Sequence, residues 1–276
     1  RRGRRKVMSE ERQRDEVLQQ AMADAERAAE LTGAVIREMS GAAEEAQVID
    51  LLDHIWGRSK ENSVLPKEFL RVLGKTGNYI AGAFVDGELI GASLGLHSSP
   101  ERRTLHSHIS GVTSNLVGKS VGYALKLHQR AWALSRGIDT IEWTYDPLIS
   151  RNANFNIRKL GATPIEYLEN FYGPMTDSIN AGDSSDRLLV RWHLRDPAVL
   201  ALLAHDSRVP VPSGSSTVAI PDDIEAMRTS DPEQAKQWRL SVREQLTNLL
   251  SAGGQIIGFE RGTGYILDQA SDKGEK

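Results

Sequence analysis

The chain has 276 residues, of which 39% are hydrophobic and 26% are charged, and it contains no cysteine. These values are typical of a globular protein with a sizeable core. The lack of cysteine excludes disulfides, thiolate metal sites and a cysteine nucleophile. No apolar run reaches the length of about 18 residues that a transmembrane helix needs, so we expect no membrane partner and a cytoplasmic protein.

The net charge of −3 hides a basic N-terminus, because residues 1–6 read RRGRRK. A basic run can bind nucleic acid, but this one is short and has no interleaved aromatic residues, so we expect no nucleic-acid partner. Residues 9–31 are rich in Glu, Arg, Gln and Ala, which favour a helix with a thin apolar stripe. Residues 1–32 are therefore expected to form a basic tail and a helix that lies on the body of the protein or on a partner subunit.

Alternating and helical hydrophobic patterns predict the elements that follow. Asp86-Gly87 joins two strand patterns and is the strongest hairpin signal in the sequence. The elements predicted up to residue 145 are a strand at 34–39, helices at 42–56 and 66–73, strands at 79–85, 88–96 and 104–113, a helix at 122–136 and a strand at 140–145.

The second half of the chain mixes helices and strands in the same way. This mixed order predicts an α/β fold built on a layered sheet. We expect one domain at 33–196 and a C-terminal extension at 197–276. The elements predicted here are a helix at 152–160, a strand at 187–194, a surface linker at 206–222, a helix at 231–252 and a hairpin formed by 256–260 and 264–267.

Residues 112–122 read VTSNLVGKSVG and join a predicted strand to a long predicted helix. Glycines let a ligand approach the backbone closely. The first N–H groups of a helix lack internal partners and lie at the positive end of its dipole, so such a turn can bind pyrophosphate. A turn with a purely structural role would carry the same residues.

The same segment resembles the signature of the GNAT superfamily of acyltransferases, V-x-P-x-x-[QR]-x-x-G-x-[GA] followed three residues later by leucine. Val112, Gly122 and Leu125 match it. The resemblance implies a mixed, mostly antiparallel sheet flanked by helices, with acetyl-CoA or another acyl-CoA as cosubstrate. It also implies that the turn binds the pyrophosphate of coenzyme A and that the preceding strand binds the pantetheine arm.

A second region carries the resemblance further along the chain. Residues 152–161 are similar to the family's helix A-x-x-x-Y-x-K-x-G, which Ala153, Lys159 and Gly161 match. The run from 167 to 192 resembles a bacterial branch of acyltransferases that has been linked to the acylation of amino acids.

Several residues depart from the family pattern. Ser114 replaces the proline, Val117 replaces the Gln or Arg, and Ser120 replaces the first glycine. Lys119 can supply charge to a phosphate, and Ser120 keeps its backbone N–H, although its side chain hinders a ligand unless the backbone is α-helical. Ile157 stands where many relatives have the tyrosine that protonates the leaving thiolate, so that role is absent here.

We expect the cofactor to contact the end of the strand, the turn and two asparagines of the helix at 152–160. The resemblance places an oxyanion donor on the backbone of the fourth strand, near Gly111 or Val112. Asn152 is expected to be an N-cap, and Asn156 to reach the cofactor arm. The candidate cofactor-binding residues are Gly111, Val112, Thr113, Val117, Gly118, Lys119, Ser120, Val121, Gly122, Asn152 and Asn156.

Acyl transfer from a thioester to an amine needs a base for the amine and is helped by an acid for the thiolate. His106 and His108 are two residues apart on one strand, so they share a face, and both titrate near neutrality. Glu142 is a second candidate base, although a paired or solvated strand residue is the simpler interpretation. Tyr145 and Tyr172 are the nearest substitutes for the missing acid, and each also suits a core or rim position. The candidate catalytic residues are His108, Glu142, Tyr145 and Tyr172.

The leading hypothesis is a CoA-dependent N-acyltransferase that acetylates or succinylates the amino group of a small molecule, with amino acids as candidate acceptors. The alternative is a GNAT-fold protein whose CoA site has diverged, and which binds a ligand or catalyses a different reaction. A third and weaker hypothesis is a module that binds nucleic acid or a protein partner. No group of residues has metal-ligand spacing, so we expect no metal. The terminal strand and the added helices offer surfaces for a homodimer.

Overall fold

The structure of the chain is a computed structural model that describes residues 2–114, 120–173, 183–205, 212 and 214–268. The chain divides into two units, Arg1–Ile141 and Glu142–Lys276. No helix in the described ranges combines the length and the hydropathy of a transmembrane segment.

The first unit is built around four antiparallel strands in the order β1-β2-β3-β4. Asp86 and Gly87, which join β2 to β3, have φ values of 51° and 81°. Positive φ at both positions is what a type I′ turn requires, so the predicted hairpin is confirmed. The elements of this unit are α1 (Arg2–Thr32), β1 (Val35–Glu38), α2 (Ala42–Ile55), η1 (Lys60–Asn62), α3 (Lys67–Lys75), β2 (Tyr79–Val85), β3 (Glu88–His97), β4 (Thr104–Val112) and α4 (Val121–Ser135).

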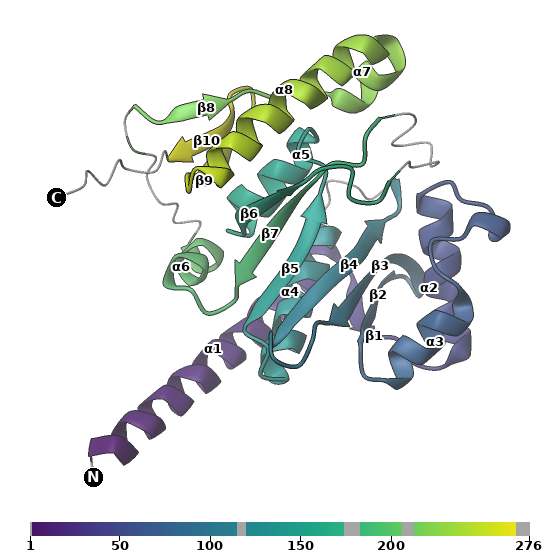
Figure 1. Cartoon of the computed structure of the whole chain (residues 1–276). Coiled ribbons are helices and arrows are strands. Elements are labelled where there is room, and N and C mark those ends of the chain that lie inside the picture. The colour runs from purple at the N-terminus through teal and green to yellow at the C-terminus, as the bar shows by residue number, and fades with distance from the viewer. Residues whose placement is uncertain (1, 115–119, 174–182, 206–211, 213, 269–276) are drawn as a thin grey trace. The chain divides into compact units, whose positions relative to one another are not determined.

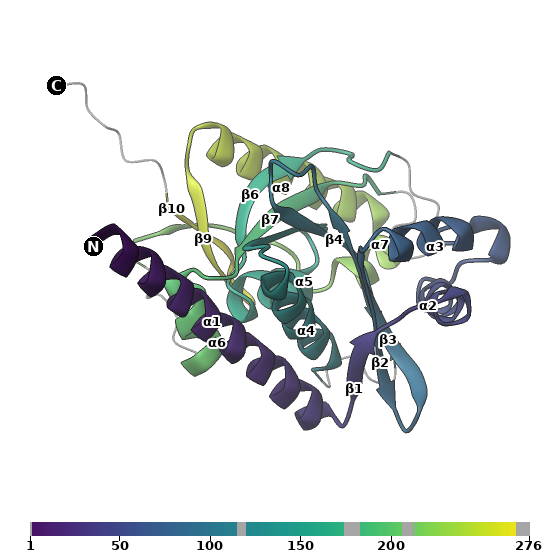
Figure 2. The same cartoon turned by 90° about the horizontal axis from the view of Figure 1, so that it is seen from below.

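Helices cover both faces of these four strands (Figure 2). α1 and α4 pack against each other on one face, and α2 and α3 lie on the other. α4 is buried around most of its circumference, because neighbours cover it on several sides. The sheet covers one side of α4, and α1 presents the buried residues Ala21, Ala25 and Ala28 to another. The predicted N-terminal helix therefore lies on the body of its own chain.

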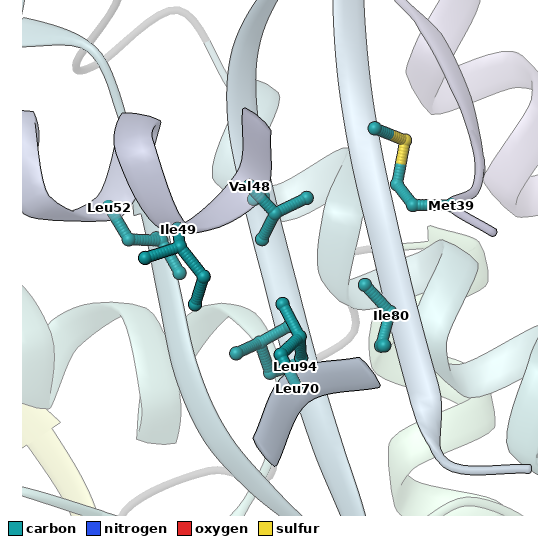
Figure 3. Close-up of a cluster of buried hydrophobic side chains, with 8 residues drawn as sticks. Met39, Val48, Ile49, Leu52, Leu70, Ile80 and Leu94 are labelled. Carbon is teal, nitrogen blue, oxygen red and sulfur yellow. The ribbon is translucent and has the colours of Figure 1, made fainter. Parts of the chain in front are cut away.

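The core between the strands and the α2–α3 face fixes the position of β3 and hence of β4 (Figure 3). Its side chains come from two helices, two strands and the connection after β1. Deleting such a buried aliphatic side chain costs about 2–5 kcal/mol in a typical core. The cluster consists of Met39, Val48, Ile49, Leu52, Leu70, Ile80, Ala92 and Leu94.

A β-bulge interrupts β4. Leu94 pairs with Ile109, whereas Gly95 pairs with Ser107, so His108 is the extra residue on β4. A bulge shifts the alternation of side chains by one position. Ser107 and Ser110 therefore both lie on the face of β4 that α4 covers, although they are an odd number of positions apart.

The second unit contains the rest of a seven-stranded, mostly antiparallel sheet whose order is β1-β2-β3-β4-β5-β7-β6, and a three-stranded sheet in the order β8-β10-β9 (Figure 1). The predicted α/β fold is confirmed. The remaining elements are β5 (Thr140–Tyr145), α5 (Ser150–Ala153), η3 (Asn154–Lys159), β6 (Thr163–Leu168), β7 (Arg187–His193), α6 (Pro197–His205), β8 (Ser216–Val218), α7 (Ile224–Ser230), α8 (Pro232–Ser251), β9 (Gln255–Glu260) and β10 (Gly264–Asp268).

Three local predictions for this unit need correction. The predicted linker at 206–222 contains β8, which pairs with β10. Its three residues are too few to show alternation, so only the pairing with a distant strand reveals it. The predicted helix at 152–160 begins earlier and continues as a π-helical segment, η3, in which the N–H of Leu160 donates to the carbonyl of Phe155 at 3.1 Å. Asn152 lies inside α5, whose N-cap is Ile149, so it is not the predicted N-cap.

The start of α8 follows the prediction. Asp231 is its N-cap, and the carboxylate accepts a hydrogen bond from the N–H of Gln234 at 3.0 Å. Pro232 follows at the first helical position, where its missing N–H costs nothing. This local capping signal is readable from the sequence because it involves only neighbouring residues.

Candidate functional site

The last residues of β4 lead into the predicted phosphate-binding turn. The N–H of Thr113 donates to the carbonyl of Ile90 on β3 at 2.9 Å, and Gly111 lies opposite Ala92. Because the N–H groups of successive strand residues point to opposite sides, the N–H of Gly111 points toward β3 and that of Val112 points away from it. Of the two residues expected to supply an oxyanion donor, Val112 is thus the one whose N–H is directed away from β3.

α4 begins at Ser120, which has a φ of 66° and whose side chain makes no capping hydrogen bond. The N–H of Ala124 donates to the carbonyl of Ser120 at 3.0 Å. The N–H groups of Val121 and Gly122 have no acceptor within the helix. The first turn of α4 carries no acidic side chain, so its dipole is available to an anion.

The protein leaves room beside this helix end. A Cβ added at Gly122 would meet only Val112 Cγ2, at 4.0 Å, so packing among the described residues does not require glycine there. Thr113 Oγ1 is buried and has no hydrogen-bond partner among the described residues. An unsatisfied buried hydroxyl costs about 1–3 kcal/mol, which a polar group of a ligand would recover. These features fit the pyrophosphate and pantetheine of coenzyme A.

The opposite face of the same strand end is filled by protein. A Cβ at Gly111 would lie 2.7 Å from the ring of Trp56, so glycine is required there by the close contact with the end of α2. Val121 is buried beside Leu125 and contributes its side chain to the core, which leaves only its backbone for a ligand. Val117, Gly118 and Lys119 lie outside the described residues.

The two histidines of β4 lie on one face, as expected. The rings of His106 and His108 have centroids 6.2 Å apart. His108 is exposed as a residue, yet protein packed around its ring lowers its pKa below the usual value by desolvation. A histidine of this kind is neutral at pH 7 and can accept a proton.

Two other candidates are engaged in the interior of the second unit. Glu142 is buried, and its carboxylate accepts a hydrogen bond from Arg191 Nε at 2.7 Å. Tyr145 is buried, and its hydroxyl lies 3.1 Å from that of Tyr265. Burial raises the pKa of Tyr145 far above the usual value, so this phenol is a poor proton donor at neutral pH.

Tyr172, in contrast, is exposed. Its hydroxyl lies 3.3 Å from Thr144 Oγ1, and its ring lies under the guanidinium of Arg187 at 5.3 Å. The backbone N–H of Tyr172 donates to Ser185 Oγ at 3.0 Å, which holds the residue in place. Of the two candidate tyrosines, only this one keeps its hydroxyl accessible.

The two asparagines differ in the same way. Asn152 is partly exposed on α5. Asn156 is buried, and its Oδ1 accepts a hydrogen bond from Trp143 Nε1 at 3.1 Å. This bond ties η3 to β5 and orients the amide of Asn156 toward the interior.

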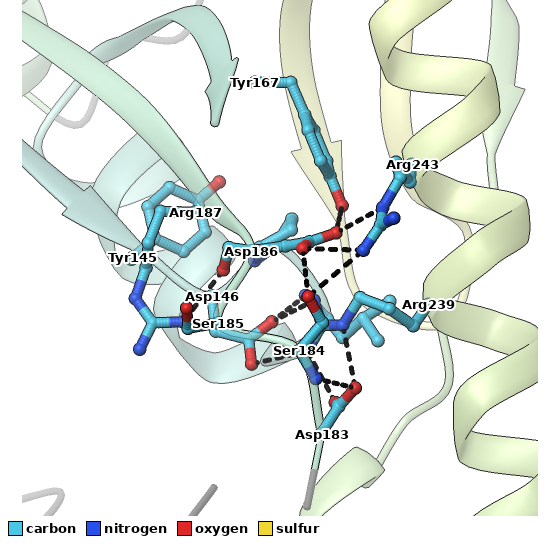
Figure 4. A network of polar contacts seen from close by, with 12 residues as sticks. Tyr145, Asp146, Tyr167, Asp183, Ser184, Ser185, Asp186, Arg187, Arg239 and Arg243 are labelled. Carbon is cyan, nitrogen blue, oxygen red and sulfur yellow. Dashed lines mark hydrogen bonds and ion pairs between the residues drawn. The ribbon is translucent and has the colours of Figure 1, made fainter. Parts of the chain in front are cut away.

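An ionic network that the sequence did not reveal organises the second unit (Figure 4). Arg239 on α8 donates to Asp146 at 2.8 Å and to Asp183 at 2.7 Å, and Arg228 on α7 contacts both carboxylates. All four side chains are at most 9% exposed. The arginine pairs hold the pKa of Asp146 below its usual value against the opposing effect of burial. The positive charges of Arg228 and Arg239 balance the negative charges of Asp146 and Asp183, so the charges of the cluster compensate one another.

A second part of the network lies next to the first (Figure 4). Asp186 accepts hydrogen bonds from the hydroxyl of Tyr167 at 2.7 Å and from Arg243 Nε at 2.8 Å. Burial and the carboxylate of Asp186 raise the pKa of Tyr167. The network joins α7 and α8 to the strands of their own unit. The only available sequence signal was the spacing of Arg239 and Arg243, four residues apart on one helix face.

The described residues contain no cluster of His, Asp and Glu suited to a metal ion. The second unit does contain a cavity of about 540 Å³ between η3, α6 and β9, with a mainly apolar lining that includes Val199, Leu202, Ile256 and Phe259. None of the candidate catalytic or cofactor-binding residues line it.

No family model matches the sequence, and no curated protein matches it. Solved structures do match. The ribosomal-protein-S18-alanine N-acetyltransferase of Escherichia coli is similar over 58% of this chain and 94% of its own, at 12% identity and a TM-score of 0.46. An acetyltransferase of the GNAT family from Streptococcus pneumoniae is similar over 57% and 97%, at 15% identity and a TM-score of 0.47.

A GNAT family acetyltransferase from Elizabethkingia anophelis with acetyl-CoA bound is similar over 58% of this chain and 98% of its own, at 16% identity and a TM-score of 0.44. At such identities and TM-scores the likeness carries no conclusion about this chain. The chain itself has a seven-stranded, mostly antiparallel sheet flanked by helices. Its residues that fit a cofactor lie at the end of β4 and the start of α4.

Proposed function

We propose that the protein is a CoA-dependent N-acyltransferase that transfers an acetyl or another acyl group from acyl-CoA to the amino group of a small molecule. The start of α4 is the observation that carries this proposal. It combines helix N–H groups without acceptors inside the helix with open space at Gly122 and a buried Thr113 hydroxyl that has no hydrogen-bond partner, both with respect to the described residues. Together these features suit the pyrophosphate and the adjoining arm of coenzyme A.

The chemistry requires the amine to lose a proton, the carbonyl oxygen to accept negative charge and the thiolate to leave. The proposed oxyanion donor is the N–H of Val112, which points away from β3. The proposed base is His108, because its lowered pKa keeps it neutral. Glu142 is held by Arg191 and is less suited to this role.

The proposed acid is Tyr172, whose hydroxyl is accessible, rather than the buried Tyr145. Amino acids are the first acceptors to examine, since the run from 167 to 192 resembles a branch linked to amino acid acylation. Polyamines and aminosugars come next, because they present the same primary amine.

Calorimetric titration with acetyl-CoA and succinyl-CoA tests the proposal directly. We expect micromolar binding of at least one, followed by thiol release when the correct amine is added. The Gly122→Val variant should lose binding at least tenfold, because its side chain would enter the open space beside the helix end. The fold leaves room for the added Cβ, so the thermal transition should stay within a few degrees of the parent. If neither acetyl-CoA nor succinyl-CoA binds, the proposal is overturned.

The alternative of a diverged site also makes a definite prediction. Ser114, Ser120 and Ile157 are the described residues that depart from the family pattern. If acyl-CoA binds and no amine releases the thiol, the protein is a ligand-binding module or catalyses a different reaction. A Tyr at position 157 would then be the substitution to introduce, as Ile157→Tyr, with thiol release as the readout.

A further inference from the structure

A chain of polar side chains runs through the interior of the first unit, between α4 and the strands β3 and β4. Lys126 Nζ donates to Gln129 Oε1 at 3.2 Å, and Gln129 Nε2 donates to Ser93 Oγ at 3.4 Å. Ser93 Oγ lies 2.7 Å from Ser110 Oγ. Lys126, Gln129 and Ser93 are at most 5% exposed, whereas Ser110 is exposed.

The orientation of the Gln129 amide sets the direction of the chain at that residue. Its amide oxygen faces Lys126 Nζ, and its amide nitrogen faces Ser93 Oγ. Ser93 Oγ then accepts from Gln129. Either hydroxyl of the Ser93–Ser110 pair can donate, and because Ser93 Oγ already accepts from Gln129, Ser93 is the better donor of the two.

This arrangement determines what the last hydroxyl of the hydrogen-bonded series, that of Ser110, can do. Because Ser110 Oγ accepts the hydrogen of Ser93, its own hydrogen is directed outward. Each bond polarises the next, so a buried donor chain makes the terminal hydroxyl a better donor than an isolated serine.

The position of Ser110 indicates the function of its hydroxyl. It lies two residues before Val112 on the α4-facing side of β4, and it reaches that side because of the bulge at His108. It precedes the strand end and the helix start that fit coenzyme A. The backbone N–H of Ser110 shares the direction of the Val112 N–H, away from β3.

We infer that the hydroxyl of Ser110 donates a hydrogen bond to the thioester of bound acyl-CoA, and that Lys126, Gln129 and Ser93 position it. This inference rests on the proposed function. Negative charge on the thioester grows as the reaction proceeds, so a donor fixed in advance stabilises the transition state more than the bound substrate. Ser110 is then a catalytic residue, and the three buried residues are positioning residues.

Three variants separate this role from a structural one. Ser110→Ala should lower kcat at least tenfold while leaving the KM for acyl-CoA within about twofold. Ser110→Thr keeps a hydroxyl on a residue type that strands favour, so it should retain most of the activity. Ser93→Ala removes the donor to Ser110 and should lower kcat by a smaller factor, again without a change in KM.

Ser107→Ala is the matched control. Ser107 also lies on the α4-facing side of β4 and accepts from Lys126 Nζ at 2.7 Å, but it touches the chain only at Lys126, three side chains away from Ser110. We expect its kcat to stay within twofold of the parent. Calorimetric binding of acyl-CoA to each variant verifies that the site is folded.

The outcomes distinguish the two proposals. If the parent protein shows no acyl transfer, the proposed function and this inference fall together. If the parent is active and Ser110→Ala keeps its kcat, or if Ser110→Thr is as impaired as Ser110→Ala, the role of Ser110 is overturned and the proposed function stands. Equal losses in Ser107→Ala and Ser93→Ala would overturn the positioning chain.

Discussion

Ser120 is the residue at the helix start whose backbone is least suited to a side chain. Its φ of 66° lies in the left-handed region, which costs a residue with a Cβ about 1–2 kcal/mol. The family pattern has glycine at this position, and glycine adopts such a φ without a steric penalty. The structure thus explains the physical reason for the glycine, and it shows that the backbone here is not α-helical.

We predict that Ser120→Gly raises the free energy of unfolding by about 0.5–1 kcal/mol, because relief of the left-handed strain exceeds the added entropy of the unfolded chain. It should also tighten acyl-CoA binding, since no side chain then borders the helix start. Urea unfolding and calorimetric titration measure the two effects. A lower free energy of unfolding would contradict the assignment of strain to Ser120.

Lys126 carries a pH dependence of stability. Burial lowers its pKa to about 7 from the usual 10.5. Between these values the unfolded chain binds more protons than the folded one, so stability rises with pH. The rise approaches about 1.4 kcal/mol per pH unit inside this window and ends above the unfolded pKa.

Comparison of the parent with Lys126→Met isolates the contribution of Lys126 to the pH dependence of stability. The free energy of unfolding, measured in urea at pH 7, 8 and 9, should increase more steeply for the parent than for the variant. The absolute offset between the two also contains the lost bonds to Ser107 and Gln129, and the slopes are free of that offset. Parallel curves would mean that Lys126 keeps an ordinary pKa.

At the scale of elements, the ionic network of the second unit is the main long-range connection that the structure adds. Arg239 of α8 bonds to Asp146, which follows β5, and to Asp183. Removing one partner of a buried ion pair leaves an uncompensated charge and costs about 3–5 kcal/mol. The network therefore makes the docking of α7 and α8 strongly dependent on one residue.

Arg239→Met is expected to lower the free energy of unfolding by about 3 kcal/mol. The control is Arg12→Met, which removes an exposed pair with Glu16 on α1 whose side chains are 82% and 64% exposed. Surface pairs contribute about 0–1 kcal/mol, so this variant should unfold like the parent. Chemical denaturation followed by circular dichroism measures both. Equal effects of the two substitutions would show that the buried network adds no stability.

Among the elements, those with local sequence signals could be predicted and those defined by pairing could not. The hairpin at Asp86-Gly87 and the cap at Asp231 were predicted because each depends on adjacent residues. β8 was missed because a strand of three residues is defined by its partner β10. The bulge at His108 was missed because a register shift appears only when β3 and β4 pair.

For the whole molecule, the order of helices and strands predicted an α/β fold on a layered sheet, and the structure confirms it. The expected boundaries at 32 and 196, the cytoplasmic location and the homodimer stay predictions. Membership of the GNAT superfamily, acyl transfer and its acceptor stay proposals.

The sequence by itself determined the hydrophobic periodicity, the turns and the segment at 112–122, because these patterns are local. The residues of the candidate site also divide into those that local sequence identifies and those whose role only the fold decides. Val112 and Gly122 were identified from the sequence as matches to the turn, while tertiary structure decided that Glu142 and Tyr145 are engaged in the interior. It also decided that Ser110 ends a buried donor chain, because only folding brings Lys126, Gln129 and Ser93 into contact and removes them from water.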